Sequence, residues 1–119
     1  MRIIVCGSRS FADFDLLKHT LDRLTRKLDK GKLVILSGHA QGADRLGEQW
    51  AFERAINREV YHANWDKHGE AAGPIRNQEM VENAGALVAF WNGTSAGTKD
   101  VIIQARKHKL KVRVVLFEG

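Results

Sequence analysis

Apolar residues along the chain alternate between short, nearly continuous runs and longer stretches with helical spacing. Short apolar runs rich in β-branched residues are typical of strands that are buried on both faces. They predict five strands, at residues 2–6, 33–36, 59–62, 86–91 and 111–117. Apolar residues that recur every three or four positions predict helices at 13–30, 43–56, 76–83 and 98–108. Residues 63–75 contain the single proline, Pro74, and are expected to be irregular.

This order of elements predicts an α/β fold. Strands that alternate with helices form a parallel sheet covered on both faces, with right-handed crossovers. The 119 residues contain no repeat, low-complexity tract or linker. A chain of this length can bury one core without disulfides. We therefore expect a single domain, residues 1–119, with a three-layer, doubly wound, five-stranded parallel sheet.

The glycines are concentrated in the loops that follow the predicted strands. Seven of the eleven lie there, at positions 7, 38, 42, 69, 73, 93 and 97. In a doubly wound sheet, ligands bind beyond the carboxyl ends of the strands, where the strand order reverses. The loops therefore predict a ligand site at that edge.

The stretch FWNGTSAGTKD, residues 90–100, has the features of a phosphate cradle. Gly93 and Gly97 allow close backbone approach, while Thr94, Ser95 and Thr98 offer hydroxyls. A helix that starts near Thr98 would direct free N–H groups and its positive dipole end at the same point. The alternative is a tight turn with Thr98 as the helix N-cap.

The loop after the first strand has a similar composition with a cation added. Gly7 turns the chain, Ser8 offers a hydroxyl, and Arg9 can pair with a phosphate through two hydrogen bonds. The alternative for Arg9 is a surface ion pair with Asp13 or Asp15.

The loop SGHAQGAD, residues 37–44, contains Gly38 and Gly42 and ends on Asp44 in the first turn of a helix. A carboxylate beside a phosphate cradle suits ribose hydroxyls, although an acidic residue is also favoured at a helix start for structural reasons alone. His39 is either an acid or base near neutral pH or an incidental loop residue.

The loop after the third strand supplies further candidates. Trp65 offers a planar surface for a base, with rim packing as the alternative, and Arg76 and Asn77 stand at a helix start. Trp91 ends the fourth strand. The histidines are scattered and the cysteine is isolated, so we expect no metal site and no cofactor.

Composition narrows the function classes. The chain is 44% hydrophobic and 28% charged, as in ordinary globular proteins. A net charge of +5 favours an anionic partner, with solubility alone as the alternative. Its first apolar run is too short for a signal peptide or membrane span. The lone cysteine, Cys6, fits a reducing compartment and predicts a cytoplasmic protein without membrane attachment.

Four motifs together resemble a known family. GSRSFADFDLL, LSGHAQGADRLGEQWA, ANWDKHGEAAGPIRNQEM and ALVAFWNGTSAGTKDVI are similar, in order and spacing, to the YspA-type branch of the SLOG superfamily. The resemblance implies a Rossmann-like domain that binds nucleotides or nucleotide-derived ligands. Relatives include the Lonely guy phosphoribohydrolases, the DNA-processing protein of natural transformation, and sensor domains of bacterial immunity systems.

The resemblance also suggests site residues. The relatives' Gly-Gly-x-Gly-Thr phosphate loop matches Gly97-Thr98. The hydrolases place a glutamate three residues after that threonine, where this chain has Val101. Arg76 is the expected equivalent of the arginine that partners this glutamate, and Glu79 or Asp44 would have to supply the carboxylate.

Three functions follow as hypotheses. The chain binds a small nucleotide-like ligand as a sensor or sequestering module. Alternatively it hydrolyses an N-glycosidic or phosphoribosyl bond with Arg76, Glu79 and Asp44, or it binds nucleic acid. Related domains often form oligomers through helices, and Trp50 and Phe52 are candidate contact residues for a homo-oligomer.

Overall fold

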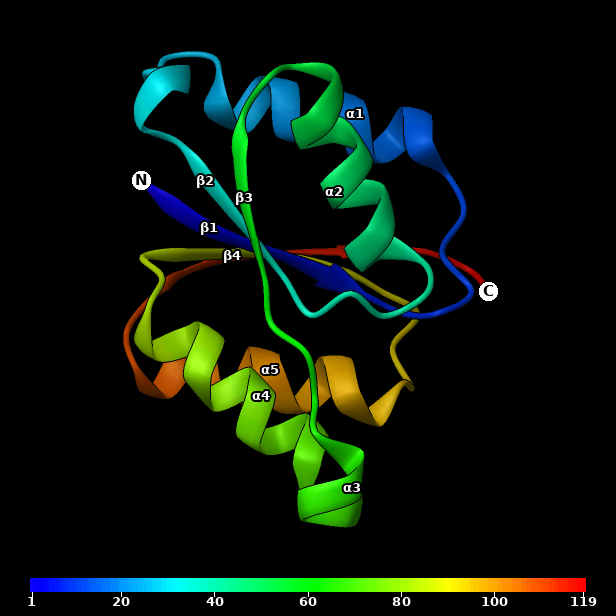
Figure 1. Ribbon diagram of the computed structural model, residues 1–119. Coiled ribbons are helices and arrows are strands. Elements are labelled where there is room, and N and C mark those ends of the chain that lie inside the picture. The colour runs from blue at the N-terminus through cyan, green and yellow to red at the C-terminus, as the bar shows by residue number, and fades with distance from the viewer.

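The computed structural model describes residues 1–119 and consists of a five-stranded sheet between two layers of helices (Figure 1). The strands are β1 Arg2–Gly7, β2 Val34–Ser37, β3 Asn57–Val60, β4 Ala86–Trp91 and β5 Lys111–Leu116. The helices are α1 Phe14–Thr25, α2 Ala43–Glu53, α3 Trp65–His68, α4 Ala72–Glu82 and α5 Ala96–Lys107, with short 3₁₀ turns at Lys30–Lys32 and Gly69–Ala71. The predicted doubly wound α/β fold is confirmed.

All strands are parallel, in the order β3-β2-β1-β4-β5. The central strand β1 pairs with β2 on one side and β4 on the other. Beyond β1 the chain runs to α1 on one face of the sheet, whereas beyond β4 it runs to α5 on the opposite face (Figure 1). The strand order therefore reverses between β1 and β4, where doubly wound proteins place their ligands.

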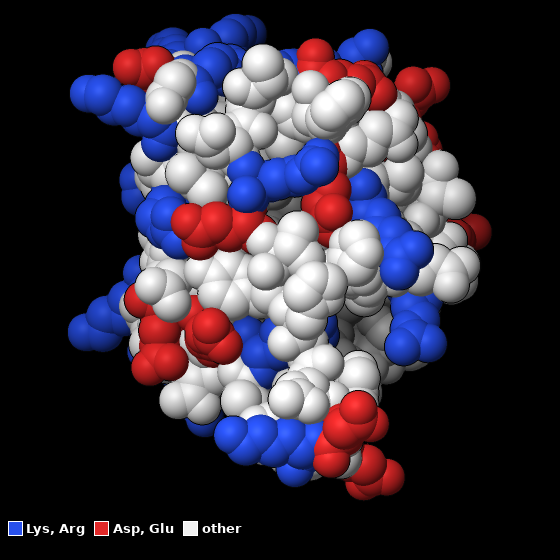
Figure 2. Space-filling view, in the orientation of Figure 1, with Lys and Arg blue, Asp and Glu red and all other residues white.

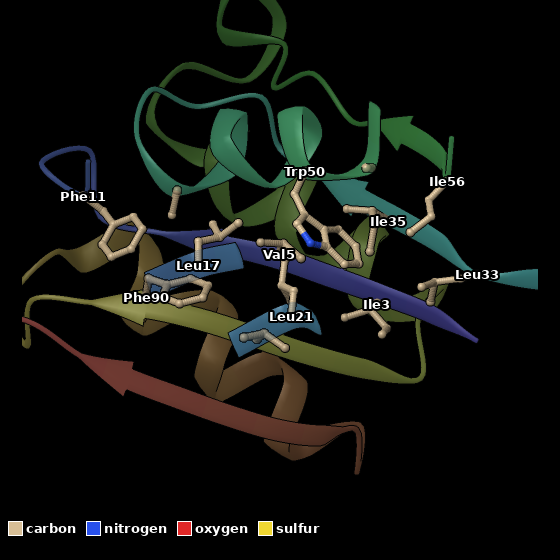
Figure 3. Packing of buried hydrophobic residues seen from close by; sticks show 13 residues of the cluster. Ile3, Val5, Phe11, Leu17, Leu21, Leu33, Ile35, Trp50, Ile56 and Phe90 are labelled. Atoms are coloured by element: carbon tan, nitrogen blue, oxygen red, sulfur yellow. The ribbon is translucent and has the colours of Figure 1, made fainter. Parts of the chain in front are cut away.

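Each face of the sheet has its own hydrophobic core, because successive residues of a strand point to opposite faces. Ile3 and Val5 of β1 belong to the cluster under α1 and α2, together with Trp50 (Figure 3). Ile4 and Cys6 belong to the cluster under α4 and α5. Both strand faces are thus buried, which explains the continuous apolar runs in the sequence.

Two of the predicted segments differ in the structure: one predicted helix is shorter, and one segment predicted to be irregular is largely helical. The helix expected over 13–30 ends at Thr25, whose hydroxyl donates to the Leu21 carbonyl at 2.7 Å. Leu28 still packs against the core, from a turn, and Gly31 lies in the following 3₁₀ turn. The segment 63–75 is not irregular: it contains α3, the 3₁₀ turn Gly69–Ala71 and the start of α4. Pro74 lies in the first turn of α4, where its missing N–H costs no helical hydrogen bond.

Other boundaries shift by a few residues. The third strand is Asn57–Val60 instead of 59–62, because pairing with β2 recruits the polar edge residues Asn57 and Arg58. Helix α5 starts at Ala96, two residues before Thr98, and α2 ends at Glu53.

The two residues suggested as oligomer contacts lie in different surroundings. Trp50 is fully buried and its indole N–H donates to Asp22 Oδ1 at 3.0 Å, so it joins α2 to α1. It is therefore not available as a contact residue. Phe52 is 72% exposed, with the Arg58 guanidinium over its ring.

Two further properties concern the whole chain. None of its helices combines the length and apolar character needed to cross a membrane. No three His, Cys, Asp or Glu side chains converge in the manner of a metal site.

Gly47 provides a test of the packing between α2 and β1. A Cβ atom at position 47 would lie 2.7 Å from Val5 Cγ1, whereas one at Gly97, in α5, would meet nothing within 4 Å. We expect Gly47→Ala to lower the free energy of unfolding by about 1–3 kcal/mol, because overpacking outweighs the helix propensity of alanine. The matched change Gly97→Ala should leave it within about 0.5 kcal/mol or raise it. Urea denaturation of both variants measures the difference, and equal stabilities would contradict this packing.

Candidate functional site

A cavity of about 690 Å³ opens at the carboxyl edge of the sheet, at the switch point between β1 and β4. Its walls come from the loop after β1, the loop after β4 with the first turn of α5, and the start of α4. The cavity therefore lies where the sequence predicted the site, although nothing in the sequence gave its size.

Ser8 joins the two loops that form the floor of the cavity. Its backbone N–H donates to the Phe90 carbonyl at 2.9 Å, and its hydroxyl accepts from the Asn92 N–H at 3.0 Å. The same hydroxyl shares a 2.9 Å hydrogen bond with Ser95 Oγ. Ser8 is 2% exposed, so its side chain holds the two loops together and is not an exposed ligand for a phosphate.

The first turn of α5 faces the cavity without a side-chain cap. Ser95 occupies the N-cap position and makes no capping hydrogen bond, so the alternative of Thr98 as N-cap is wrong. Residues Ser95 to Thr98 all line the cavity. The first N–H groups of a helix have no partner within it, and they carry the positive end of the helix dipole. This turn is therefore suited to bind an anion.

The loop before α5 is shaped by Asn92. Its Oδ1 accepts hydrogen bonds from the Thr94 and Ser95 N–H groups at 3.0 and 2.9 Å. The Trp91 indole N–H donates to the Ser95 carbonyl at 3.1 Å. Trp91 thus fixes the loop from the strand side, and Thr94 points its own hydroxyl at Asn92 Oδ1.

Two arginines line the cavity without a carboxylate partner. Arg9 is exposed, and neither it nor Arg76 belongs to any of the ion pairs in the protein. The expected alternative, a pair between Arg9 and Asp13 or Asp15, is not formed. Arg76 is held in place instead by neutral acceptors: its Nη1 donates to the Gly38 carbonyl at 2.8 Å and its Nε to Asn77 Oδ1 at 3.0 Å.

Asp44 is the buried carboxylate of the cavity. It is 4% exposed, and burial raises its pKa from 3.8 to about 6. The Arg76 guanidinium and the backbone N–H groups of Ala40, Gly7 and Gly38 oppose this rise. The site thus contains a carboxyl group that titrates close to neutral pH.

Asn77 connects α4 to α5 behind the cavity. Its amide donates to Asp100 Oδ2 at 3.0 Å, and the same oxygen accepts from Gln104 Nε2 at 2.9 Å. Asn77 is 4% exposed. Its role in the structure is to link Arg76 to the first turns of α5.

Trp65 forms part of the rim. It is 57% exposed, lines the cavity, and lies beside Gly73 at the start of α4. A large exposed aromatic at a cavity mouth offers a stacking surface for a flat group.

The structure brings together most of the residues that the sequence singled out. Nine further candidates line this cavity besides Asp44: Gly7, Ser8, Arg9, Trp65, Arg76, Asn77, Ser95, Gly97 and Thr98. Gly38 lines an adjoining cavity. Gly42, Thr94, Gly93 and Glu79 line neither cavity.

The four outliers have other surroundings. Gly42 has φ +92° and lies against the Ser8 and Arg9 carbonyls, so it serves the contact between two loops. Gly93, with φ +87°, and Thr94 lie in an exposed turn. Glu79 is exposed on α4 and does not line the cavity.

Sequence reasoning missed Asn92 and the cavity-lining Glu70. An asparagine directly after a buried strand and two residues before a threonine is a typical start of an Asx turn, which was a usable signal for Asn92. Glu70 lies in the 3₁₀ turn within the segment that was expected to be irregular.

The chain is 32% identical to the gene 61 protein of Mycobacterium phage D29, over 93% of each chain. Its fold is similar to that of DNA processing protein A from Streptococcus pneumoniae, with a TM-score of 0.73 and 15% identity. That likeness covers 95% of this chain and 49% of the other, so the present chain spans about half the length of that protein.

The family comparison agrees with the resemblance in the motifs. Residues 1–68, which include β1, the loop SGHAQGAD and α2, match the YspA, cpYpsA-related SLOG family. The chain therefore belongs to the YspA, cpYpsA-related SLOG family.

Proposed function

We propose that this protein binds a nucleotide or nucleotide-derived ligand and acts as a sensor or sequestering module. One observation carries the proposal: the uncapped first turn of α5 and two arginines without carboxylate partners line the same cavity. Unpaired N–H groups, a helix dipole and guanidinium groups all favour negative charge. A phosphate is the anion that suits this combination.

The remaining walls of the cavity fit the other parts of a nucleotide. Asp44 supplies a carboxylate that can accept hydrogen bonds from sugar hydroxyls. Trp65 supplies an exposed indole on which a base can stack. A phosphate at α5, a sugar near Asp44 and a base at Trp65 would account for the chemistry of three walls.

Hydrolysis of the ligand is the second candidate function, and the pKa of Asp44 supports it. A buried carboxyl group that titrates near 6 is suited to general acid or base catalysis at neutral pH. If Asp44 activates water, Asp44→Asn abolishes turnover and leaves ligand affinity largely intact. Glu82→Gln, an exposed change on α4 outside both cavities, is the charge-matched control.

Nucleic-acid binding is a further alternative, suggested by the net charge of +5. Figure 2 shows Lys and Arg side chains interspersed with Asp and Glu side chains on the face in view, without one continuous basic stripe. A protein that contacts several phosphates of a nucleic acid loses affinity steeply with salt. A weak salt dependence with one compact site favours the mononucleotide.

The experiment that tests the proposed function is a thermal-shift screen with product analysis. The ligands are AMP, ADP, ATP, ADP-ribose, NAD, cyclic dinucleotides and short single-stranded DNA. A ligand at 100 times its dissociation constant adds about 2.7 kcal/mol of stability, which shifts Tm by several degrees. A shift with intact ligand is the expected result, conversion identifies an enzyme, and a response to DNA alone overturns the proposal.

Gly97 gives the sharpest variant for the phosphate site. Gly97 lines the cavity, and a Cβ atom at this position would meet no other atom within 4 Å. We expect affinity for the ligand found in the screen to fall from glycine to alanine and to be lost in Gly97→Val, while Tm of the free protein changes little. Isothermal titration calorimetry measures the affinities. Normal binding by Gly97→Val would place the phosphate elsewhere.

Asp44 predicts a pH dependence of stability. Because the folded-state pKa, about 6, lies above the ordinary value of 3.8, the folded protein keeps a proton that the unfolded chain has lost between these values. The contribution of Asp44 to stability therefore falls as the pH rises through this window and is constant above it.

We expect Asp44→Asn to gain up to about 3 kcal/mol over the wild type between about pH 4 and about pH 7. Urea denaturation at several pH values measures the difference. The free energy of unfolding of Glu82→Gln should follow the wild-type pH dependence across the same range. If the curve of Asp44→Asn also ran parallel to the wild type, the shifted pKa would be contradicted.

A further inference from the structure

A second cavity, of about 450 Å³, adjoins the first at the loops that follow β2 and β3. The two cavities share four lining residues: Arg9, Ala40, Trp65 and Arg76. They are therefore neighbouring spaces with a common wall, and a ligand seated in the first can extend into the second.

The lining of the second cavity is positively charged. Three arginines and two histidines are among its ten lining residues, and no aspartate or glutamate is. The first cavity, in contrast, includes the carboxyl groups of Asp44, Glu70 and Asp100. Guanidinium groups without a carboxylate in the same lining favour an anion over a neutral group.

His39 is held in a defined orientation within this lining. Its Nδ1 lies 2.8 Å from Glu48 Oε2, an oxygen that also accepts from the Ser37 hydroxyl at 2.7 Å. A carboxylate can only accept, so Nδ1 carries a proton. Nε2 then donates to a phosphate oxygen in the imidazolium form and accepts from a phosphate hydroxyl in the neutral form. Glu48 is behind the histidine and does not line the cavity itself.

The backbone of His39 adds a second constraint. Its φ is +59°, in the left-handed region that non-glycine residues rarely adopt, and its N–H donates to Ser37 Oγ at 3.0 Å. Ser37 and Glu48 thus fix both the backbone and the ring of this residue. Such an arrangement keeps the imidazole in place without help from a ligand.

Arg45 is the cation that belongs to the second cavity alone. Its Nε donates to the His39 carbonyl at 3.3 Å, and it forms no ion pair. Its exposed guanidinium keeps further donors for a ligand. His62, whose ring lies edge-on to that of His39 at 5.4 Å, completes the set on the β3 side.

We propose that the second cavity binds a second phosphate group of the same ligand, recognised by Arg45 and His39. The ligand class is then a nucleotide with two separated phosphate groups, one at α5 and one between the β2 and β3 loops. This inference rests on the proposed function, because the first phosphate is assigned to the cavity described above.

Residue-resolved NMR tests the two cavities independently, with inorganic phosphate as the probe and sodium chloride at equal ionic strength as the reference. We expect saturable amide shifts at Gly97 and Thr98 and a second saturable set at His39, Gln41 and Arg45. Shifts at the first set alone would overturn the second site and leave the nucleotide site standing. Shifts at the second set alone would support the second site and overturn the proposed function, and the absence of both would overturn both.

Substitutions then test whether the Arg45 and His39 side chains bind the phosphate that causes the second set of shifts. Arg45→Gln, and His39→Asn because asparagine tolerates positive φ, should each weaken phosphate at the second cavity about tenfold without changing the first. Arg26→Gln, an exposed charge-matched change at the end of α1, should change neither. Unaltered binding in both test variants would contradict the assignment.

The nucleotide arm compares AMP with adenosine 3′,5′-bisphosphate in the same variants. We expect the bisphosphate to bind the wild type at least tenfold more tightly than AMP, and this ratio to approach one in Arg45→Gln. Equal affinities in the wild type would overturn the inference even if AMP binds, whereas Gly97→Val should weaken both ligands.

Discussion

The hydrogen bond from the Ser8 N–H to the Phe90 carbonyl is the contact on which the site depends. It continues the pairing of β1 with β4 one residue beyond the strand, just before the two chains separate to opposite faces of the sheet. The Ser8 hydroxyl then holds Asn92 and Ser95 on the other side of the gap. A glycine at position 7 is required here, because a Cβ would overlap the Phe90 carbonyl. The divergence of the chains opens the cavity, and Ser8 fixes its floor.

The arginines of this protein differ in whether they form an ion pair with a carboxylate. Arg2 and Arg54 pair with Glu59 and Asp22 away from the cavity. Arg9, Arg45 and Arg76, which lie around the two cavities, have no such partner. The nearest compensation for Arg76 is the buried Asp44, whose ionised form burial opposes. Arg9 and Arg45 form no ion pair, so an anionic ligand that spans the two cavities, as we propose, would supply the negative charge that these two guanidinium groups lack.

The sequence was most informative where a segment is buried on both sides. The predicted strand at 86–91 coincides with β4, whose four central residues are all buried between the two helical layers. It was least informative where pairing or packing decides. β3 is an edge strand that begins with polar residues, and α1 ends at Thr25 although Leu28 continues its apolar spacing. The site followed the same rule. Loop glycines and arginines were visible as a pattern, but the difference between Gly97, which faces open space, and Gly42, which faces a carbonyl, exists only after the loops have packed.

The carboxyl groups argue for binding more strongly than for cleavage. The position at which the resembling hydrolases carry their glutamate is Val101, which is 2% exposed and packs in the core under α4 and α5. Asp100 already accepts hydrogen bonds from Asn77 and Gln104, and Glu79 is exposed and does not line the cavity. Asp44 is therefore the buried carboxyl group in this cavity that acid or base chemistry would use. Burial raises the pKa of Asp44 to about 6, but Arg76 and the surrounding backbone amides oppose this rise by stabilising the charged form, which suits a fixed hydrogen-bond acceptor for sugar hydroxyls. A cavity with several hydrogen-bond donors for an anion, and with Asp44 as an acceptor for sugar hydroxyls, is better equipped to hold a nucleotide than to cleave it.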